Sequence, residues 1–148
     1  MKDDMFFAIT SSILLVFIAC FVFYEILYIT FKLITRYDLR ARPFMFLLVG
    51  MIFAAHTIIV WGYAAFYWAM VHYWDFKPLS GAIQDDFFDY IYFSAATYSS
   101  LGIGDVYPHG ALRFITGVQV LNGLILIGWS VTVSYFAVQK LWDTHLKK

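Results

Sequence analysis

The sequence predicts an all-α membrane protein with three transmembrane helices and one short re-entrant helix. Of the 148 residues, 62% are hydrophobic and only 14% are charged, whereas a soluble domain typically carries about 25% charged residues. Three apolar segments, 6–31, 44–74 and 114 to about 140, each exceed the length needed to cross a bilayer core, which is roughly 20 residues. A fourth apolar segment, 86–99, is too short to cross.

The composition argues against several classes of function. The net charge is zero, so no nucleic-acid partner is expected. Cys20 is the single cysteine and lies inside an apolar run, which excludes a disulfide within the chain and a cysteine metal cluster. The sequence shows no nucleophile–base constellation and no phosphate-binding loop, so it does not predict an enzyme.

The charged residues predict how the chain crosses the membrane. Seven of the ten Lys and Arg residues lie between the first two spans or near the C-terminus: Lys32, Arg36, Arg40, Arg42, Lys140, Lys147 and Lys148. By the positive-inside rule these regions are cytoplasmic and the N-terminus is outside, in a plasma or inner membrane. Seven of the ten acids fall on the opposite side, namely Asp3, Asp4, Asp75, Asp85, Asp86, Asp89 and Asp105.

The segment DDFFDYIYFSAATYSS, residues 85–100, predicts a helix that enters the membrane without crossing it. It is too apolar for a solvated loop and too short for a span. Asp85 or Asp86 is expected to cap its N-terminus, where a carboxylate suits the positive end of the helix dipole. Its negative C-terminal end then points into the membrane, directly before Gly102 and Gly104.

The stretch TYSSLGIGDVYPHG, residues 97–110, interrupts the apolar pattern at this depth. Non-helical backbone is tolerated there only where it is buried in protein or lines a water-filled path. Gly102 and Gly104 open conformations that other residues avoid, so successive carbonyls can point to one side. Such a row, ending at the Ser100 hydroxyl, can replace water around a dehydrated cation. Because one chain supplies one row, the pattern indicates a cyclic oligomer with the ion on its symmetry axis.

The motif SSLGIGDVYP resembles the potassium-channel filter signature Thr-Thr-Val-Gly-Tyr-Gly-Asp, which an aliphatic residue, Tyr and Pro follow in several bacterial members. The unit from 44 to 140 resembles that family's pore domain, with an outer helix at 44–74, a pore helix at 86–99, a filter at 100–105 and an inner helix at 113–141. Arg113 and Gly123 stand where bacterial members carry an arginine and the inner-helix hinge glycine. On this division residues 1–43 form an N-terminal transmembrane helix with a basic connector, and 44–148 form the pore domain.

The resemblance implies a homotetramer in the lipid bilayer that conducts monovalent cations, with K⁺ as the permeant ion and no organic cofactor. It implies that K⁺ meets the filter carbonyls of Ser100, Leu101, Gly102 and Ile103, with Gly104 completing the row. It places Asp105, Tyr107 and His109 at the outer mouth, where the Tyr107 ring can hold quaternary ammonium ions by cation–π contact. The residues implied to line the cavity and gate below Gly123 are Leu124, Ile127, Val131, Thr132 and Tyr135. Close helix packing is the alternative expectation for Gly123.

Several positions depart from the family pattern. Ile103 stands where tyrosine is usual, so it keeps bulk but loses the phenol's hydrogen bond. Tyr92 and Phe93 fill the places of a common tryptophan pair, and Ala96 stands where some members carry a glutamate paired with the filter aspartate. Asp105 is therefore expected to lack that partner. The expected consequence is a filter held more by packing than by hydrogen bonds, with weaker selectivity for potassium over sodium.

Two alternatives to a potassium-permeable channel stay open. One is a weakly selective monovalent cation channel, and the other is a small non-conducting membrane subunit that regulates a partner. The first span lies outside the minimal pore unit and holds no row of arginines, so it does not predict a voltage sensor. His56 lies in the middle of the second span with nothing at metal-ligand spacing, and we expect a packed, hydrogen-bonded residue.

Overall fold

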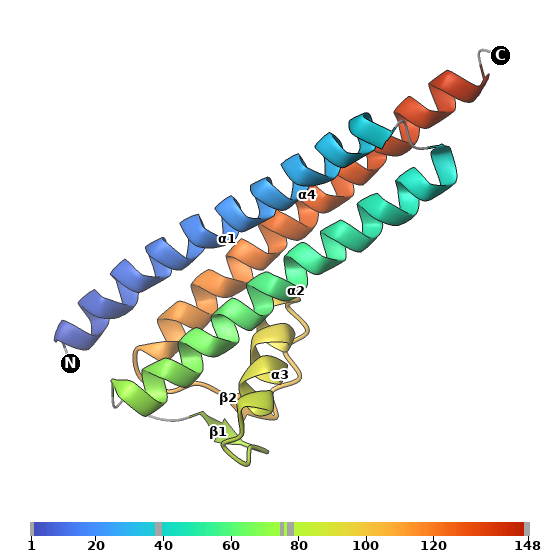
Figure 1. Ribbon diagram of the computed structural model, residues 1–148. Helices are drawn as coiled ribbons and strands as arrows, with labels where there is room; N and C mark the ends of the chain where they lie inside the picture. The colour runs from blue at the N-terminus through green and yellow to red at the C-terminus, as the bar shows by residue number, and fades with distance from the viewer. Residues whose placement is uncertain (1, 38–39, 75, 77–78, 147–148) are drawn as a thin grey trace.

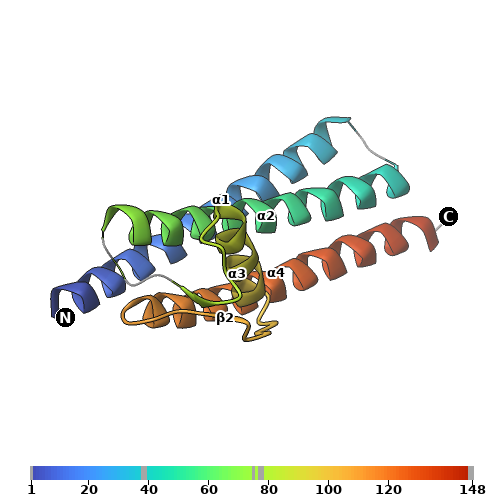
Figure 2. The same cartoon turned by 90° about the horizontal axis from the view of Figure 1, so that it is seen from below.

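The computed structural model describes the chain except at residues 1, 38–39, 75, 77–78 and 147–148, and it describes no side chains at 2–3, 41 and 141–146. Its elements in chain order are α1 (Lys2–Tyr37), α2 (Ala41–Tyr73), β1 (Ser80–Gly81), α3 (Phe87–Tyr98), β2 (Val106–Tyr107) and α4 (Leu112–Leu146). The three long helices run side by side in alternating directions, and the short α3 lies against α2 and α4 (Figure 1). Seen from below, α3 stands between these two helices (Figure 2).

The three long helices have the composition of transmembrane helices. The stretches Asp4–Tyr37, Arg42–Tyr73 and Leu112–Lys140 are long and apolar enough to cross a membrane. The 12 residues of α3 span only about 18 Å of helix, which is less than a bilayer core. The predicted all-α class is confirmed, and the chain is an integral membrane protein.

α1 and α2 extend further toward their connector than the apolar segments indicated. α1 continues to Tyr37, and α2 already begins at Ala41. Pro43 thus lies inside the first turn of α2 and not at the end of a connector. A proline is tolerated there because the first N–H groups of a helix have no partner within it.

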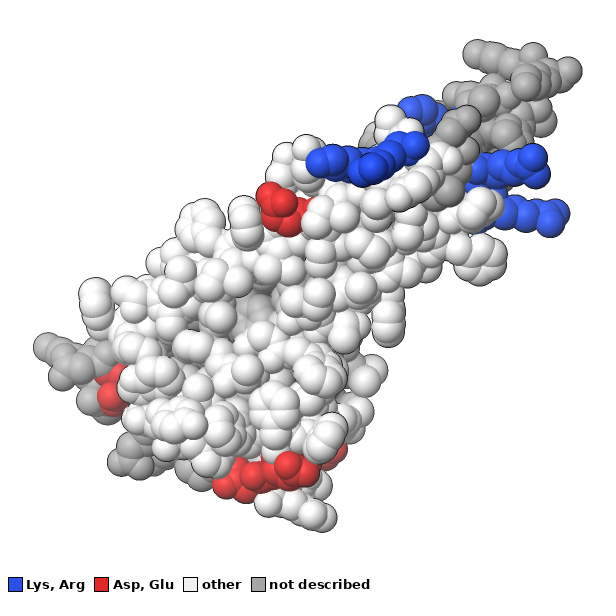
Figure 3. Space-filling model, viewed as in Figure 1, with Lys and Arg blue, Asp and Glu red and all other residues white. Residues whose placement is uncertain are grey.

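Basic and acidic residues gather at opposite ends of the molecule. On the face visible in Figure 3, Lys and Arg gather where α1 ends and α2 begins. Acidic residues lie at the opposite end, beside the start of α3. Of the charged residues counted in the sequence, Asp38, Asp75, Lys77, Lys147 and Lys148 lie outside the described residues.

A buried chain of hydrogen bonds fastens α3 between α2 and α4. The Tyr67 hydroxyl of α2 donates to Gln119 Oε1 of α4 at 2.7 Å. Gln119 Nε2 donates to Ser94 Oγ of α3 at 2.8 Å, and the Ser94 hydroxyl donates to the Val60 carbonyl of α2 at 2.8 Å. Because each of these donors has an acceptor, the network stabilises a single arrangement of the three helices in an apolar interior.

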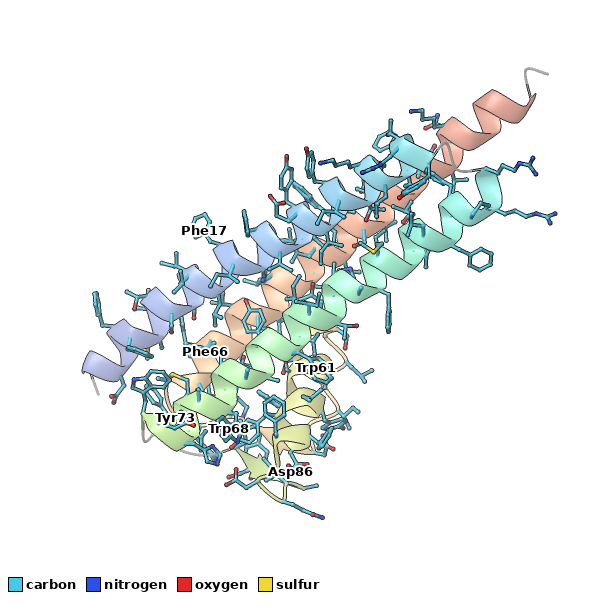
Figure 4. All side chains as sticks on the ribbon, viewed as in Figure 1. Phe17, Trp61, Phe66, Trp68, Tyr73 and Asp86 are labelled. Atoms are coloured by element: carbon cyan, nitrogen blue, oxygen red, sulfur yellow. The ribbon has the colours of Figure 1, made fainter. Side chains whose placement is uncertain are left out.

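α1 packs against both α2 and α4. Phe23 of α1 is only 1% exposed, and its ring lies 5.5 Å from the ring of His56 on α2. Nearer the N-terminus, the Phe7 ring lies 6.0 Å from the Trp74 ring. On the opposite face Phe17 is exposed and points away from the other helices (Figure 4). α1 therefore covers one side of the other two helices and keeps an apolar outer face suited to lipid.

Candidate functional site

Carboxylates fix the start of α3. Asp86 stands at the N-cap position (Figure 4), and Asp89 lies in the first turn. Asp89 Oδ2 accepts hydrogen bonds from the backbone N–H of Gln84 at 2.8 Å and of Asp86 at 3.3 Å. Asp85 accepts a hydrogen bond from the Tyr90 hydroxyl at 2.7 Å. The sequence left Asp85 and Asp86 as candidates for the N-cap, and Asp86 holds that position. The side chain of Asp89 closes the first turn.

The C-terminal end of α3 leads into the candidate filter through a Schellman motif. The N–H of Leu101 donates to the Ala96 carbonyl at 2.9 Å, and the N–H of Ser100 donates to the Thr97 carbonyl at 3.0 Å. Ser100 has a φ of 59°, in the left-handed region where such a motif usually places glycine. A side chain in that conformation costs about 1–2 kcal/mol. Strain of this kind concentrates at functional positions.

Beyond Ser100 the backbone alternates in handedness. Gly102 and Gly104 have φ values of 55° and 84°, whereas Leu101 and Ile103 keep the ordinary negative φ. Left-handed residues at every second position allow successive carbonyls to point to one side of the chain. All five residues from 100 to 104 are exposed in the single chain. The loop therefore offers an uncovered row of backbone groups directly after a helix C-terminus.

Asp105 lacks the glutamate partner, as Ala96 predicts, but another side chain of α3 takes that role. The Tyr92 hydroxyl of α3 donates to Asp105 Oδ2 at 2.8 Å. Tyr92 and Ala96 lie four residues apart on one face of the helix, so the tyrosine supplies the contact from one turn before the alanine. The hydrogen bond to Asp105, together with desolvation, raises the pKa of the Tyr92 phenol above its ordinary 10.0. The hydroxyl therefore remains a donor at neutral pH.

A two-stranded ribbon holds the far end of the loop, and no pattern in the sequence revealed it. β1 pairs antiparallel with β2, with Gly81 opposite Val106. Next to this pair, the N–H of Ala82 donates to the Asp105 carbonyl at 2.9 Å. Gly81 has a φ of 117°, and a Cβ there would overlap the Asp105 carbonyl, so the position requires glycine. Because β1 precedes α3 and β2 follows the loop, the chain enters and leaves this region at the same end, as a re-entrant segment does.

The other two residues expected at the outer mouth lie beside this ribbon. Tyr107 is 49% exposed, and its ring lies 5.4 Å from the His109 ring. His109 Nε2 lies 2.8 Å from Ser80 Oγ of β1. His109 thus connects the segment after the loop to β1, while Tyr107 keeps an accessible ring face.

A small cavity of about 40 Å³ lies between the loop and α3. Its wall includes Ala96 and Ile103, two positions at which the sequence departs from the family pattern. A polar cavity needs only about 10–15 Å³ of such volume to hold a water molecule. In the single chain, the back of the loop is therefore incompletely filled by side chains at these two positions.

Gly123 of α4 lies against the end of α3. A Cβ at this position would overlap the Tyr98 carbonyl, so glycine allows a close approach of the two helices. Four of the five residues expected to line the cavity and gate are exposed in the single chain, namely Leu124, Val131, Thr132 and Tyr135. Ile127 instead packs partly against the core of its own chain. A hinge at Gly123 stays a prediction.

His56 of α2 meets both α3 and α4. Its Nδ1 lies 2.8 Å from Tyr98 Oη, and its Nε2 lies 2.7 Å from Ser130 Oγ. The expectation of a packed, hydrogen-bonded residue is confirmed. The identity of the partners was missed, because they stand 42 and 74 residues away and no local pattern joins them.

The loop carries oxygen atoms that could contact a cation. Among the described residues, no group of three or more His, Cys, Asp or Glu side chains could hold a metal ion. The oxygen donors that the loop offers are backbone carbonyls and the Ser100 hydroxyl. Rings of carbonyls bind dehydrated ions weakly enough to let them leave.

Long apolar helices that hold a short helix and an exposed glycine-containing loop are typical of membrane proteins with a re-entrant segment, a class that includes ion channels. A family profile described as "Ion channel" matches residues 11–140, a range that includes most of α1 and the whole candidate site. The chain therefore belongs to this ion-channel family. No curated protein and no solved structure matches the chain.

Proposed function

We propose that the chain is the subunit of a potassium-permeable channel in which dehydrated cations pass along the carbonyls of residues 100–104. The observation that carries this proposal is the left-handed φ at Ser100, Gly102 and Gly104, directly after the end of α3. Carbonyls in a row replace the hydration shell of an ion. The negative end of the α3 dipole adds a favourable field for a cation beside Ser100.

A homotetramer would complete this site. One chain supplies one row of carbonyls, and coordination from all sides needs further copies around an axis. α4 also exposes many large apolar side chains in the single chain, among them Leu121, Leu124, Ile125, Trp129, Val131, Tyr135 and Phe136. Packing of copies through these faces would cover them, as transmembrane helix interfaces require.

The charge distribution supports an orientation for the tetramer. The basic end, with the α1–α2 connector and the C-terminus, would be cytoplasmic, and the N-terminus would be outside. The acidic residues at the start of α3 then face the outer solution. A ring of such carboxylates raises the local concentration of cations at the pore entrance.

A weakly selective monovalent cation channel is the second candidate. The cavity beside Ala96 and Ile103 favours it, because an incompletely packed filter adjusts more easily to an ion of another size. The hydrogen bond from Tyr92 to Asp105 favours the stricter filter. We expect a preference for potassium with measurable permeability to sodium.

Flux through liposomes that contain only the purified chain tests the proposal. The wild type is expected to release potassium without any partner, and its native mass in detergent should be that of four copies. Gly104→Ala should abolish flux, because a φ of 84° disfavours any side chain. Gly50→Ala, at an open helical position on α2, is the control and should conduct. Assembled protein without flux would support the non-conducting subunit.

A further inference from the structure

His56 stands where three helices meet beside the candidate filter. It contacts Tyr98 at the end of α3 and Ser130 on α4, at 2.8 Å and 2.7 Å. Phe23 of α1 covers the imidazole and is itself almost fully buried. His56 itself is half-buried, and a hydrogen bond lost in such a place is only partly replaced by water.

The surrounding hydrogen bonds define the protonation of this ring. The Ser130 hydroxyl donates to the Leu126 carbonyl at 2.9 Å, so Ser130 Oγ must accept from His56 Nε2–H. Nδ1 is then an acceptor, and the Tyr98 hydroxyl donates to it. In the other tautomer Nδ1–H would donate to the Tyr98 hydroxyl oxygen. The Tyr98 hydroxyl proton would then have no acceptor among the hydrogen bonds of the described residues. The network therefore assigns a neutral imidazole with its proton on Nε2.

The two contacts of His56 lie on different sides of Gly123. Tyr98 is the last residue of α3, and its carbonyl packs against Gly123 itself. Ser130 lies about two helical turns further along α4, on the C-terminal side of that glycine. One rigid ring thus joins the residue that leads into Ser100 to the part of α4 that would move if the helix bent at Gly123.

We propose that His56 is a positioning residue that couples the position of α4 beyond Gly123 to the conformation of the filter. The proposal rests on the channel function proposed above. While Ser130 stays beside His56, the ring holds Tyr98 and, through it, the strained left-handed turn at Ser100. When α4 moves away, Nε2 loses its acceptor, the ring is free to turn, and Tyr98 is no longer held. The filter thereby responds to α4 without a direct contact between Ser100 and Ser130.

A double-mutant cycle in single-channel recordings tests this coupling. Tyr98→Phe and Ser130→Ala each remove one hydroxyl and keep most of the packing. Each is expected to shift the open–closed equilibrium about three- to tenfold, the range that loss of one hydrogen bond gives. The double variant should resemble either single variant, because both changes disable the same link. Two effects that multiply independently would overturn the proposal.

Replacements of His56 separate coupling from packing. The amide of His56→Gln retains one donor and one acceptor, so the two hydroxyl variants should remain non-additive in that background. His56→Phe keeps a ring but has neither group, so in that background the hydroxyl variants should have no further effect. Thr57→Ala is the control, because the Thr57 hydroxyl donates to the Phe53 carbonyl of its own helix. A shift of the open–closed equilibrium in Thr57→Ala as large as that in Ser130→Ala would count against a specific role of the His56–Ser130 hydrogen bond.

Nitrogen-15 spectra of the imidazole test the junction without any current. In wild-type tetramers His56 should show a neutral ring with the proton on Nε2, and Ser130→Ala should change its signal. A proton on Nδ1, or a signal unchanged by Ser130→Ala, would overturn the assignment. A wild-type protein that conducts no ions would refute the proposed channel function. A conducting wild type in which the effects of Tyr98→Phe and Ser130→Ala are independent would refute only the coupling.

Discussion

The Tyr92 hydroxyl donates a hydrogen bond of 2.8 Å to Asp105, 13 residues further along the chain. It joins the middle of α3 to the residue that directly follows Gly104. The backbone carbonyl of the same aspartate accepts from Ala82 beside β1. The far end of the candidate filter is therefore held from two sides, by α3 and by the strand that precedes it.

Tyr92→Phe removes one of these attachments and keeps the ring. We expect the conducting state to last several-fold less long, because Asp105 then loses its contact with α3. Single-channel dwell times measure this. Tyr24→Phe, at an exposed site on α1, is the control and should leave dwell times unchanged. Equal dwell times in the wild type and Tyr92→Phe would show that the bond does not hold the filter.

The same bond predicts a dependence on alkaline pH. The phenol donates only while neutral, and its hydrogen bond to Asp105 raises its pKa above the ordinary 10.0. Its stabilisation is thus fully present below pH 10.0 and is lost as the pH rises through the raised value. Dwell times of the wild type should approach those of Tyr92→Phe only in that alkaline range. A difference that already vanishes between about pH 7 and 9 would contradict this.

Gly123 of α4 and Gly50 of α2 are helical glycines with different surroundings. Gly123→Ala places a methyl group against the Tyr98 carbonyl and should destabilise the protein by about 1–3 kcal/mol or more. Gly50→Ala meets no atom within 4 Å and should be neutral or stabilising by up to about 1 kcal/mol. Unfolding of the purified variants in detergent measures the difference. Equal stability of the two variants would refute the close approach of α3 and α4.

The helices could be predicted from the sequence because their cause is local. Length and hydropathy alone indicate three spans, and the acidic start and glycine spacing indicate a short helix followed by an irregular loop. The position of Asp86 at the N-cap also follows from neighbouring residues. Ser100 was assigned to the loop for its hydroxyl, but its left-handed turn depends on the Schellman hydrogen bonds at the end of α3.

The attachments of the loop could not be predicted, because their partners are distant in the chain. The hydrogen bond from Tyr92 to Asp105 was not predicted, because the family pattern places the partner of the filter aspartate at position 96. The β1–β2 pair has two residues in each strand, too few for any alternation of polarity. His56 was recognised as hydrogen-bonded, but its link to Tyr98 and Ser130 needs the packing of α2, α3 and α4 together.

Ile103→Tyr tests whether the incompletely filled space behind the loop relaxes selectivity. A tyrosine can supply a ring and a hydroxyl toward α3, and we expect the potassium-to-sodium permeability ratio to rise about fivefold, as one added hydrogen bond allows. Ile103→Phe adds the ring alone and should give a smaller rise. Strong selectivity in the wild type that neither substitution changes would rule out a relaxed filter.

The reversal potential of the purified tetramer tests the central claim most directly. With potassium on one side of a bilayer, sodium on the other and equal chloride, the carbonyl pathway predicts a displacement toward the potassium equilibrium potential. Each tenfold preference for potassium displaces the potential by about 59 mV. A current that reverses at zero potential would contradict a potassium-preferring pathway through residues 100–104.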